Sequence, residues 1–118
     1  MKIAIFFKKR SYTFMVKEGT QYTMEGAAPV FDIRVPMKDG STPTLASPVM
    51  YVYKNGTDAT STYTTGSASV SGDIITTKTF QSLVGGDVLH VTIFCTVNSL
   101  ASQCVAEFPL VVRRKSGR

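Results

Sequence analysis

Few side chains in this chain of 118 residues could perform nucleophilic, acid–base or metal chemistry. One histidine, His90, and two cysteines, Cys95 and Cys104, are the only imidazole and thiol groups. Zinc sites usually take three or four such ligands. A lone strand histidine with no acid or thiol beside it in the sequence is typically a surface residue. We therefore expect no metal, no cofactor and no catalytic residue.

Eight carboxylates are the remaining candidates for chemistry. Most stand beside glycine or in turn-forming stretches, where a carboxylate accepts backbone hydrogen bonds. A glycosidase needs two of them facing each other across a substrate, and sequence spacing does not reveal such a pair. A small hydrolase is therefore the weakest alternative that we consider. The eight residues are Glu18, Glu25, Asp32, Asp39, Asp58, Asp73, Asp87 and Glu107.

The two cysteines belong to a predicted β-hairpin within residues 83–112. Apolar residues alternate over 89–97 and again over 104–112, the period of two that is typical of strands. If residues 98–101 form the loop, Cys95 pairs with Cys104 and both face the apolar side. A disulfide and a pair of buried thiols are both compatible with that register. We favour thiols, because we expect a cytoplasmic protein without a signal peptide.

Strand-like runs separated by turn residues fill the rest of the chain, and no segment has a convincing helical period. Turn signals such as Asn55-Gly56 and Gly85-Gly86-Asp87 recur about every 8–12 residues, which predicts a β-sandwich or barrel. Prolines bracket residues 37–47, which we expect to form a long loop. The predicted strands before the hairpin are 2–7, 11–16, 20–24, 30–35, 49–53, 60–64 and 74–80.

Composition predicts one folded domain. Apolar residues make up 43% of the chain and charged residues 18%, as in an ordinary globular protein. The apolar runs are far shorter than the roughly 20 residues that cross a bilayer, and the first run is shorter than the roughly 7–15 apolar residues of a signal peptide. We expect no membrane insertion, no signal peptide and a cytoplasmic protein.

The basic residues gather at the two ends and give a net charge of +5. Such ends favour solubility and can also bind an acidic partner. Both faces of the predicted strand 2–7 are apolar, which suits a strand covered by a second chain as well as its own. We expect an N-terminal segment 1–24, a sandwich 25–113 and a basic tail 114–118. The predicted partner-binding residues are Ile3, Ile5, Phe6, Phe7, Lys8, Lys9, Arg10, Arg113, Arg114 and Lys115.

Nucleic acid is an unlikely partner by this pattern. Single-strand-binding surfaces combine stacking aromatic residues with a positive groove. The basic residues of this chain lie outside its aromatic runs instead of between them. We interpret the tyrosines as core and rim residues.

Two stretches carry a resemblance to known proteins. The segment 83–93 resembles the approach to strand F of immunoglobulin-like and fibronectin-type sandwiches, with Leu89 where those domains often place a tyrosine. The stretches 53–58 and 69–78, followed by the Gly-Gly turn and the hairpin, are similar to small immunoglobulin-like proteins of phage and prophage structural gene clusters. The likeness covers residues 29–112.

This resemblance implies an all-β, immunoglobulin-like antiparallel sandwich with Greek-key connections and no enzymatic activity. It implies a virion component assembled in the host cytoplasm: a capsid decoration or head-fibre protein, or part of the neck or tail. Its partners would be other virion proteins with acidic surfaces, with self-association as a further contact. The first alternative is a carbohydrate-binding or adhesin module that recognises a host-surface glycan, and the second is a nucleic-acid-binding protein.

Overall fold

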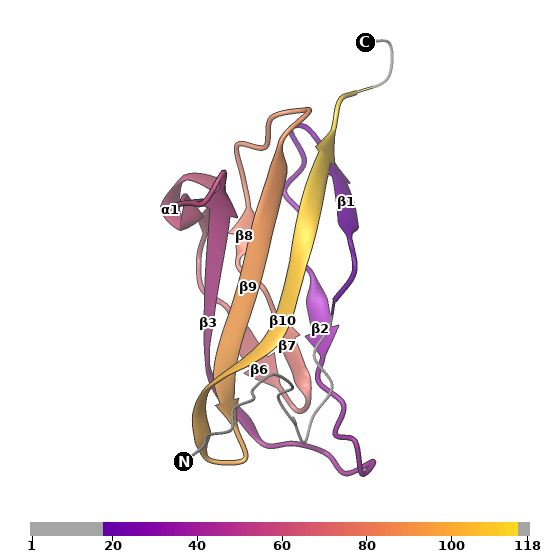
Figure 1. Cartoon of the computed structure of the whole chain (residues 1–118), viewed down its shortest axis with the longest axis vertical. Helices are drawn as coiled ribbons and strands as arrows, with labels where there is room; N and C mark the ends of the chain where they lie inside the picture. Colours follow the sequence, from indigo (N-terminus) through magenta and orange to yellow (C-terminus); the bar gives the residue numbers. More distant parts are fainter. Residues whose placement is uncertain (1–17, 116–118) are drawn as a thin grey trace, which may run out of the picture.

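The computed structural model describes residues 18–115 of the chain (Figure 1). The predicted strands 2–7 and 11–16 lie outside these residues. Within them the chain forms β1 (Gln21–Met24), β2 (Asp32–Arg34), β3 (Leu45–Lys54), β4 (Thr57–Asp58), α1 (Thr60–Tyr63), β5 (Thr64–Thr65), β6 (Ser69–Ser71), β7 (Ile74–Thr76), β8 (Thr79–Phe80), β9 (Val88–Val97) and β10 (Leu100–Arg113).

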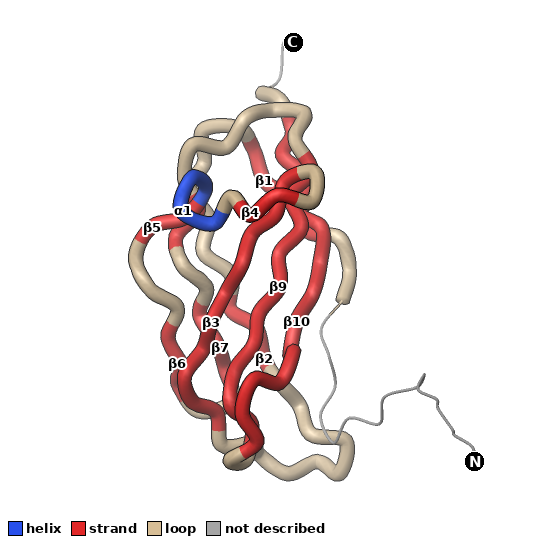
Figure 2. The backbone as a smooth tube through the Cα atoms, turned by 60° about the vertical axis from the view of Figure 1, so that its left-hand side comes forward, coloured by secondary structure: helices blue, strands red, loops and turns tan. Residues whose placement is uncertain are grey.

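The strands form two facing layers. A five-stranded sheet has the order β1-β10-β9-β3-β4 and a three-stranded sheet the order β2-β7-β6, while β5 and β8 pair separately. Figure 2 shows β3, β9 and β10 side by side, with β2, β6 and β7 in the other layer. An immunoglobulin-like sandwich places strands G, F, C and C′ in one sheet and B, E and D in the other. The strand order therefore confirms the predicted immunoglobulin-like β-sandwich.

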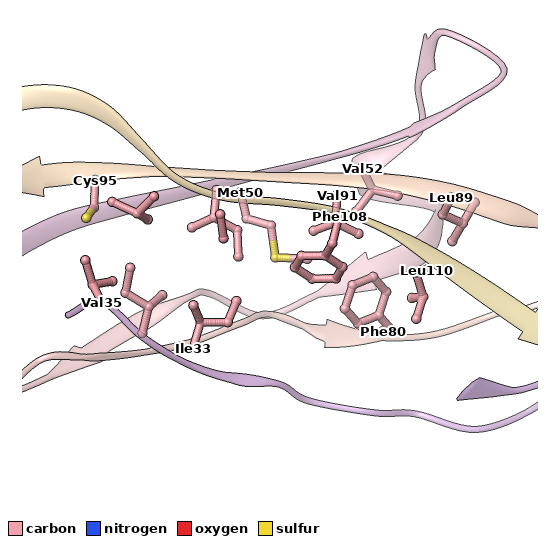
Figure 3. Close-up of a cluster of buried hydrophobic side chains, with 14 of the residues drawn as sticks. Ile33, Val35, Met50, Val52, Phe80, Leu89, Val91, Cys95, Phe108 and Leu110 are labelled. Atoms are coloured by element: carbon pink, nitrogen blue, oxygen red, sulfur yellow. The ribbon is translucent and has the colours of Figure 1, made fainter. Parts of the chain in front are cut away.

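The core lies between the two layers because strand residues alternate in and out. Ile33 of β2 lies across the interior from the strands that carry Val91 of β9 and Leu110 of β10, and all three are at most 3% exposed (Figure 3). Ile75 of β7 is also fully buried. Phe31 closes one side of this core. Its ring lies edge-on to the ring of Phe80, with centroids 5.7 Å apart, and to the ring of Phe108 at 6.0 Å.

The strand predicted over 60–64 is wrong, because the chain makes one helical turn there before β5. Asp58 starts the turn: its carboxylate accepts the Thr60 backbone N–H at 2.9 Å and the Thr60 hydroxyl at 2.7 Å. The turn carries Tyr63 into the core, and the Tyr63 hydroxyl donates to Asp87 Oδ2 at 3.3 Å. Lys54 Nζ lies 3.3 Å from the same oxygen. The pKa of Lys54 is raised, mainly by its hydrogen bond to Asp87 and next by a hydrogen bond to Tyr63.

The predicted hairpin is present, but its register changes along its length. From Ala106 to Val111 the partners are the predicted ones, with Ala106 opposite Ile93. Irregularities between Cys104 and Ala106, and between Leu100 and Gln103, then each shift the pairing. The loop consequently contracts from the predicted 98–101 to Asn98 and Ser99, both with positive φ, as in the two-residue turns that join twisted strands.

Two further boundaries differ from the sequence prediction. β3 begins at Leu45, within the predicted loop 37–47, because Leu45 pairs with Val97 beside the hairpin turn. β1 lies within the segment 1–24 that was expected to precede the sandwich. It pairs in parallel with β10, with Gln21 beside Leu110, and so extends the sandwich toward the N-terminus.

Candidate binding surface on the outer face of the five-stranded sheet

The outer face of the five-stranded sheet is the surface turned away from the core. Met50 and Val52 of β3 point inward, so Val49, Tyr51 and Tyr53 point outward. Directly paired strand residues share a face, which extends this surface across β9 and β10. Its central rows are Val49–Phe94–Cys104, Tyr51–Thr92–Glu107 and Tyr53–His90–Pro109.

Aromatic rings form the centre of this face. The Tyr51 ring lies edge-on to the Phe94 ring, with centroids 6.1 Å apart, and its centroid is 6.4 Å from that of Tyr53. Val49 is 43% exposed and Tyr51 37%. Large apolar side chains on a sheet face that nothing in 18–115 covers are typical of interaction surfaces.

One ionisable pair lies beside the aromatic centre. His90 Nε2 on β9 and Glu107 Oε2 on β10 are 3.3 Å apart, and both side chains are half exposed. Such exposed pairs contribute little to stability. The predicted hairpin register holds over these residues and pairs Glu107 with Thr92, two residues from His90 on the same face.

A hollow of about 370 Å³ opens on this face between β3, β9 and β10. Its lining carries no charged side chain and consists of Ser47, Val49, Tyr51, Phe94, Cys95, Thr96, Ala101 and Ser102. Ser47 and Ser102 have φ values of 51° and 56° and lie at irregularities in the pairing of β3 and of β10 with β9. Such bulges bend a strand and break its pairing, and here they flank the hollow on both sides.

The predicted cysteine pair is wrong. Cys95 is opposite Gln103 and faces the core, whereas Cys104 is opposite Phe94 on the outer face. The extra residue at the bulge between Cys104 and Ala106 turns the Cys104 side chain to the outer face, whereas Cys95 faces the apolar core as predicted. The two thiols are not bonded to each other. Burial raises the pKa of the Cys95 thiol to about 11, so this thiol is protonated and unreactive at neutral pH.

The predicted C-terminal basic residues gather at one corner of the sandwich. The Arg113 guanidinium carbon lies 4.6 Å from the centroid of the Tyr22 ring on β1. Arg114 packs against Gly85 and Gly86, and the Lys115 side chain approaches Gly26. Backbone hydrogen bonds from Glu25 N–H to Arg113 O (2.8 Å) and from Gly86 N–H to Val112 O (2.8 Å) hold the three segments together.

All three basic residues of this corner, Arg113, Arg114 and Lys115, are exposed, and a smaller hollow of about 260 Å³ lies between residues 25–26, 83–85 and Lys115. The other predicted partner-binding residues, from Ile3 to Arg10, lie outside the described residues.

Tyrosines contribute more to the surface than the sequence interpretation allowed. Tyr63 is a core residue, but Tyr22 is 55% exposed and Tyr51 lies at the centre of the outer face. The alternation of Val49, Tyr51 and Tyr53 around buried Met50 and Val52 was the available signal for this surface.

Residues 18–115 contain no group of three or more His, Cys, Asp and Glu side chains placed to hold a metal ion. The helix described in this part of the chain, a single turn, is far too short to cross a membrane.

No protein-family model matches the sequence, and no curated protein does. One solved structure, a chimeric titin Z1Z2 functionalised with a KLER exogenous peptide from decorin, is similar over 86% of this chain and 92% of its own, with 14% sequence identity and a TM-score of 0.37. The immunoglobulin-like assignment therefore depends on the strand order of the chain itself.

Proposed function

We propose that this protein is a non-enzymatic structural component of a phage virion that acts through protein–protein contacts. The sandwich provides a rigid body, and its surface provides the binding function. The observation that carries the proposal is the aromatic centre of the outer face, where Val49, Tyr51 and Phe94 surround an uncharged hollow. Partly exposed aromatic residues with a nearby pocket are typical of the energetic centres of protein interfaces.

The virion assignment is supported by the resemblance of residues 53–58 and 69–78 to immunoglobulin-like proteins of phage structural gene clusters. The charge distribution also favours assembly on an acidic neighbour. Residues 18–115 hold seven Lys and Arg against eight Asp and Glu, whereas residues 1–17 hold five basic residues and no acidic one. The basic ends, including the exposed corner at Arg113, Arg114 and Lys115, are therefore the proposed anchors.

Particles purified from cells that carry the gene test this proposal. The chain should be found in them by mass spectrometry at a fixed copy number. Replacing Arg113, Arg114 and Lys115 together with Glu should lower its occupancy on particles while the protein stays folded at the assay temperature, because these side chains are exposed and outside the core. Absence of the chain from the particles would refute the virion assignment. Unchanged occupancy of the triple variant would refute the basic anchor.

A second candidate is a carbohydrate-binding or adhesin module. The favouring observation is the position of Tyr51 and Phe94 beside the hydroxyl groups of Ser47, Thr96 and Ser102 in a neutral hollow, since small-ligand sites combine apolar walls with a few polar groups. Glycan-array binding that is lost in Tyr51→Ala would favour this candidate over a purely structural role.

A further inference from the structure

The hollow on the outer face is apolar, uncharged and open, and residues 18–115 leave it unfilled. Its volume of about 370 Å³ accommodates one or two large side chains. Ser47 and Ser102, which flank it, hold left-handed backbone conformations, and non-glycine residues in such conformations often mark functional sites. A suitable occupant is an uncharged apolar segment.

We propose that the N-terminal run Ile3, Ile5, Phe6 and Phe7 of the same chain occupies this hollow in the free protein. The run has apolar residues at both odd and even positions, so both faces of an extended segment would be apolar. It can therefore bury side chains in the hollow and present others to Tyr51 and Phe94. This inference goes beyond the proposed function, because it concerns the isolated chain before any partner binds.

The length of chain outside the described residues permits this contact. β1 runs parallel to β10 with Gln21 beside Leu110, and the hollow lies at Ala101 and Ser102 of β10. Eight or nine strand residues separate the two places, about 30 Å at about 3.3 Å per residue. The chain from Phe7 to Gln21 can span up to about 46 Å, so the run reaches the hollow with slack.

The direction of the chain also suits the charges. A chain running from the hollow toward β1 passes Glu107, which lies on the outer face in the row next to the Phe94 row and is half exposed. Lys8, Lys9 and Arg10 follow the apolar run directly. The basic residues would thus lie near a carboxylate of a sandwich whose acidic residues outnumber its basic ones.

Contact within one chain is favoured over contact between chains at ordinary protein concentrations, because a short tether gives an effective concentration in the millimolar range. The docked segment then covers the aromatic centre of the outer face. A partner that binds this face, or that binds the N-terminal run, has to displace it.

Trypsin tests the proposal in the full-length protein, because Lys8, Lys9 and Arg10 offer cleavage sites directly beside the run. When the docked segment opens and closes quickly, the rate of cleavage follows the fraction of molecules in which it is open. Val49→Arg should therefore be cleaved at Lys8, Lys9 and Arg10 about tenfold faster than wild type. Val84→Arg is the matched control: Val84 is also apolar and exposed, at 56%, but does not line the hollow, and should be cut like wild type. Val84→Arg should keep the wild-type melting temperature, whereas Val49→Arg should melt at a lower temperature, because docking of the segment adds to the stability of the folded state.

A second measurement locates the contact. In full-length protein, Ile5→Ser combined with Phe7→Ser should shift the amide NMR signals of Thr96, Ala101 and Ser102, whereas Met15→Ser should leave them unchanged. Equal cleavage of wild type and Val49→Arg would overturn the proposal. So would protection that increases with protein concentration, because that result would indicate docking between copies.

Discussion

Replacing Gly85 with alanine should test how closely the C-terminal basic corner is packed. Gly85 does not have a left-handed backbone, so alanine meets no conformational strain there. A Cβ atom would lie 2.6 Å from Arg114 Cγ and 2.9 Å from Arg114 Cα, and it would also meet the Glu25 carboxylate. The two side chains can rotate away from the new Cβ. The Arg114 Cα cannot, because it belongs to the backbone just after β10, so relieving this contact requires a shift of the backbone.

Overpacking of this kind costs about 1–3 kcal/mol. A loss of 1 kcal/mol lowers the melting temperature of a domain this small by about 4–8 °C. Urea unfolding of Gly85→Ala should therefore show a clear decrease in the free energy of unfolding. Gly66→Ala is a useful comparison, because Gly66 has φ +83° with open space around it. It should lose about 1 kcal/mol from the left-handed conformation alone.

The cause can be isolated in an Arg114→Ala background. Alanine at 114 removes Cγ but keeps Cα, so Gly85→Ala should cost less in this background without becoming neutral. A loss below about 0.3 kcal/mol in the wild-type background would show that Arg114 does not pack on Gly85 as described. An equal cost in both backgrounds would show that the backbone at Arg114, and not its Cγ, opposes the added Cβ. The same displacement should also weaken partner binding through the corner.

Two other variants and one labelling experiment test the fold. Asp58→Ala removes two hydrogen bonds from Thr60 and should lower the melting temperature. Those bonds lower the pKa of Asp58, so their contribution to stability is present above the unfolded pKa of about 4 and is lost on acidification. The difference in melting temperature between wild type and Asp58→Ala should therefore shrink toward about pH 2. Cys95, with its pKa raised to about 11, should react with iodoacetamide at pH 8 far more slowly in native than in urea-unfolded protein, as peptide mass spectrometry would show. Tyr63→Phe removes one hydrogen bond to Asp87 and should cost about 1 kcal/mol in urea unfolding.

The sandwich was predictable because its strands have strong local signals. Alternation over β9 and β10 and the turn residues between strands identified the fold class and the faces of residues 106–112. The bulge before Ala106 was not predictable from alternation, since Cys104 continues the apolar parity in the sequence while the extra backbone residue turns its side chain outward. The outward position of Cys104 depends on the pairing of whole strands.

The helical turn at α1 illustrates another limit. Threonine-rich residues 60–64 have strand propensity, and four residues are too few to show a helical period. The turn is stabilised by the two hydrogen bonds from Thr60 to the Asp58 carboxylate and by burial of Tyr63, whose hydroxyl donates to Asp87. The candidate surface depends on similar long-range facts, because Tyr51, Phe94 and Glu107 meet only through the order of β3, β9 and β10.

The tip of the hairpin constrains how this protein could be used as a scaffold for displayed peptides. Asn98 and Ser99 make a tight turn that is tied to Thr44 by two hydrogen bonds. The Asn98 backbone N–H donates to Thr44 O at 2.9 Å, and the Thr44 backbone N–H donates to Asn98 Oδ1 at 2.8 Å. Foreign sequence inserted at this tip would break both bonds and loosen the start of β3. The exposed turn at Asn55 and Gly56, where added atoms at the glycine meet open space, is the better insertion point.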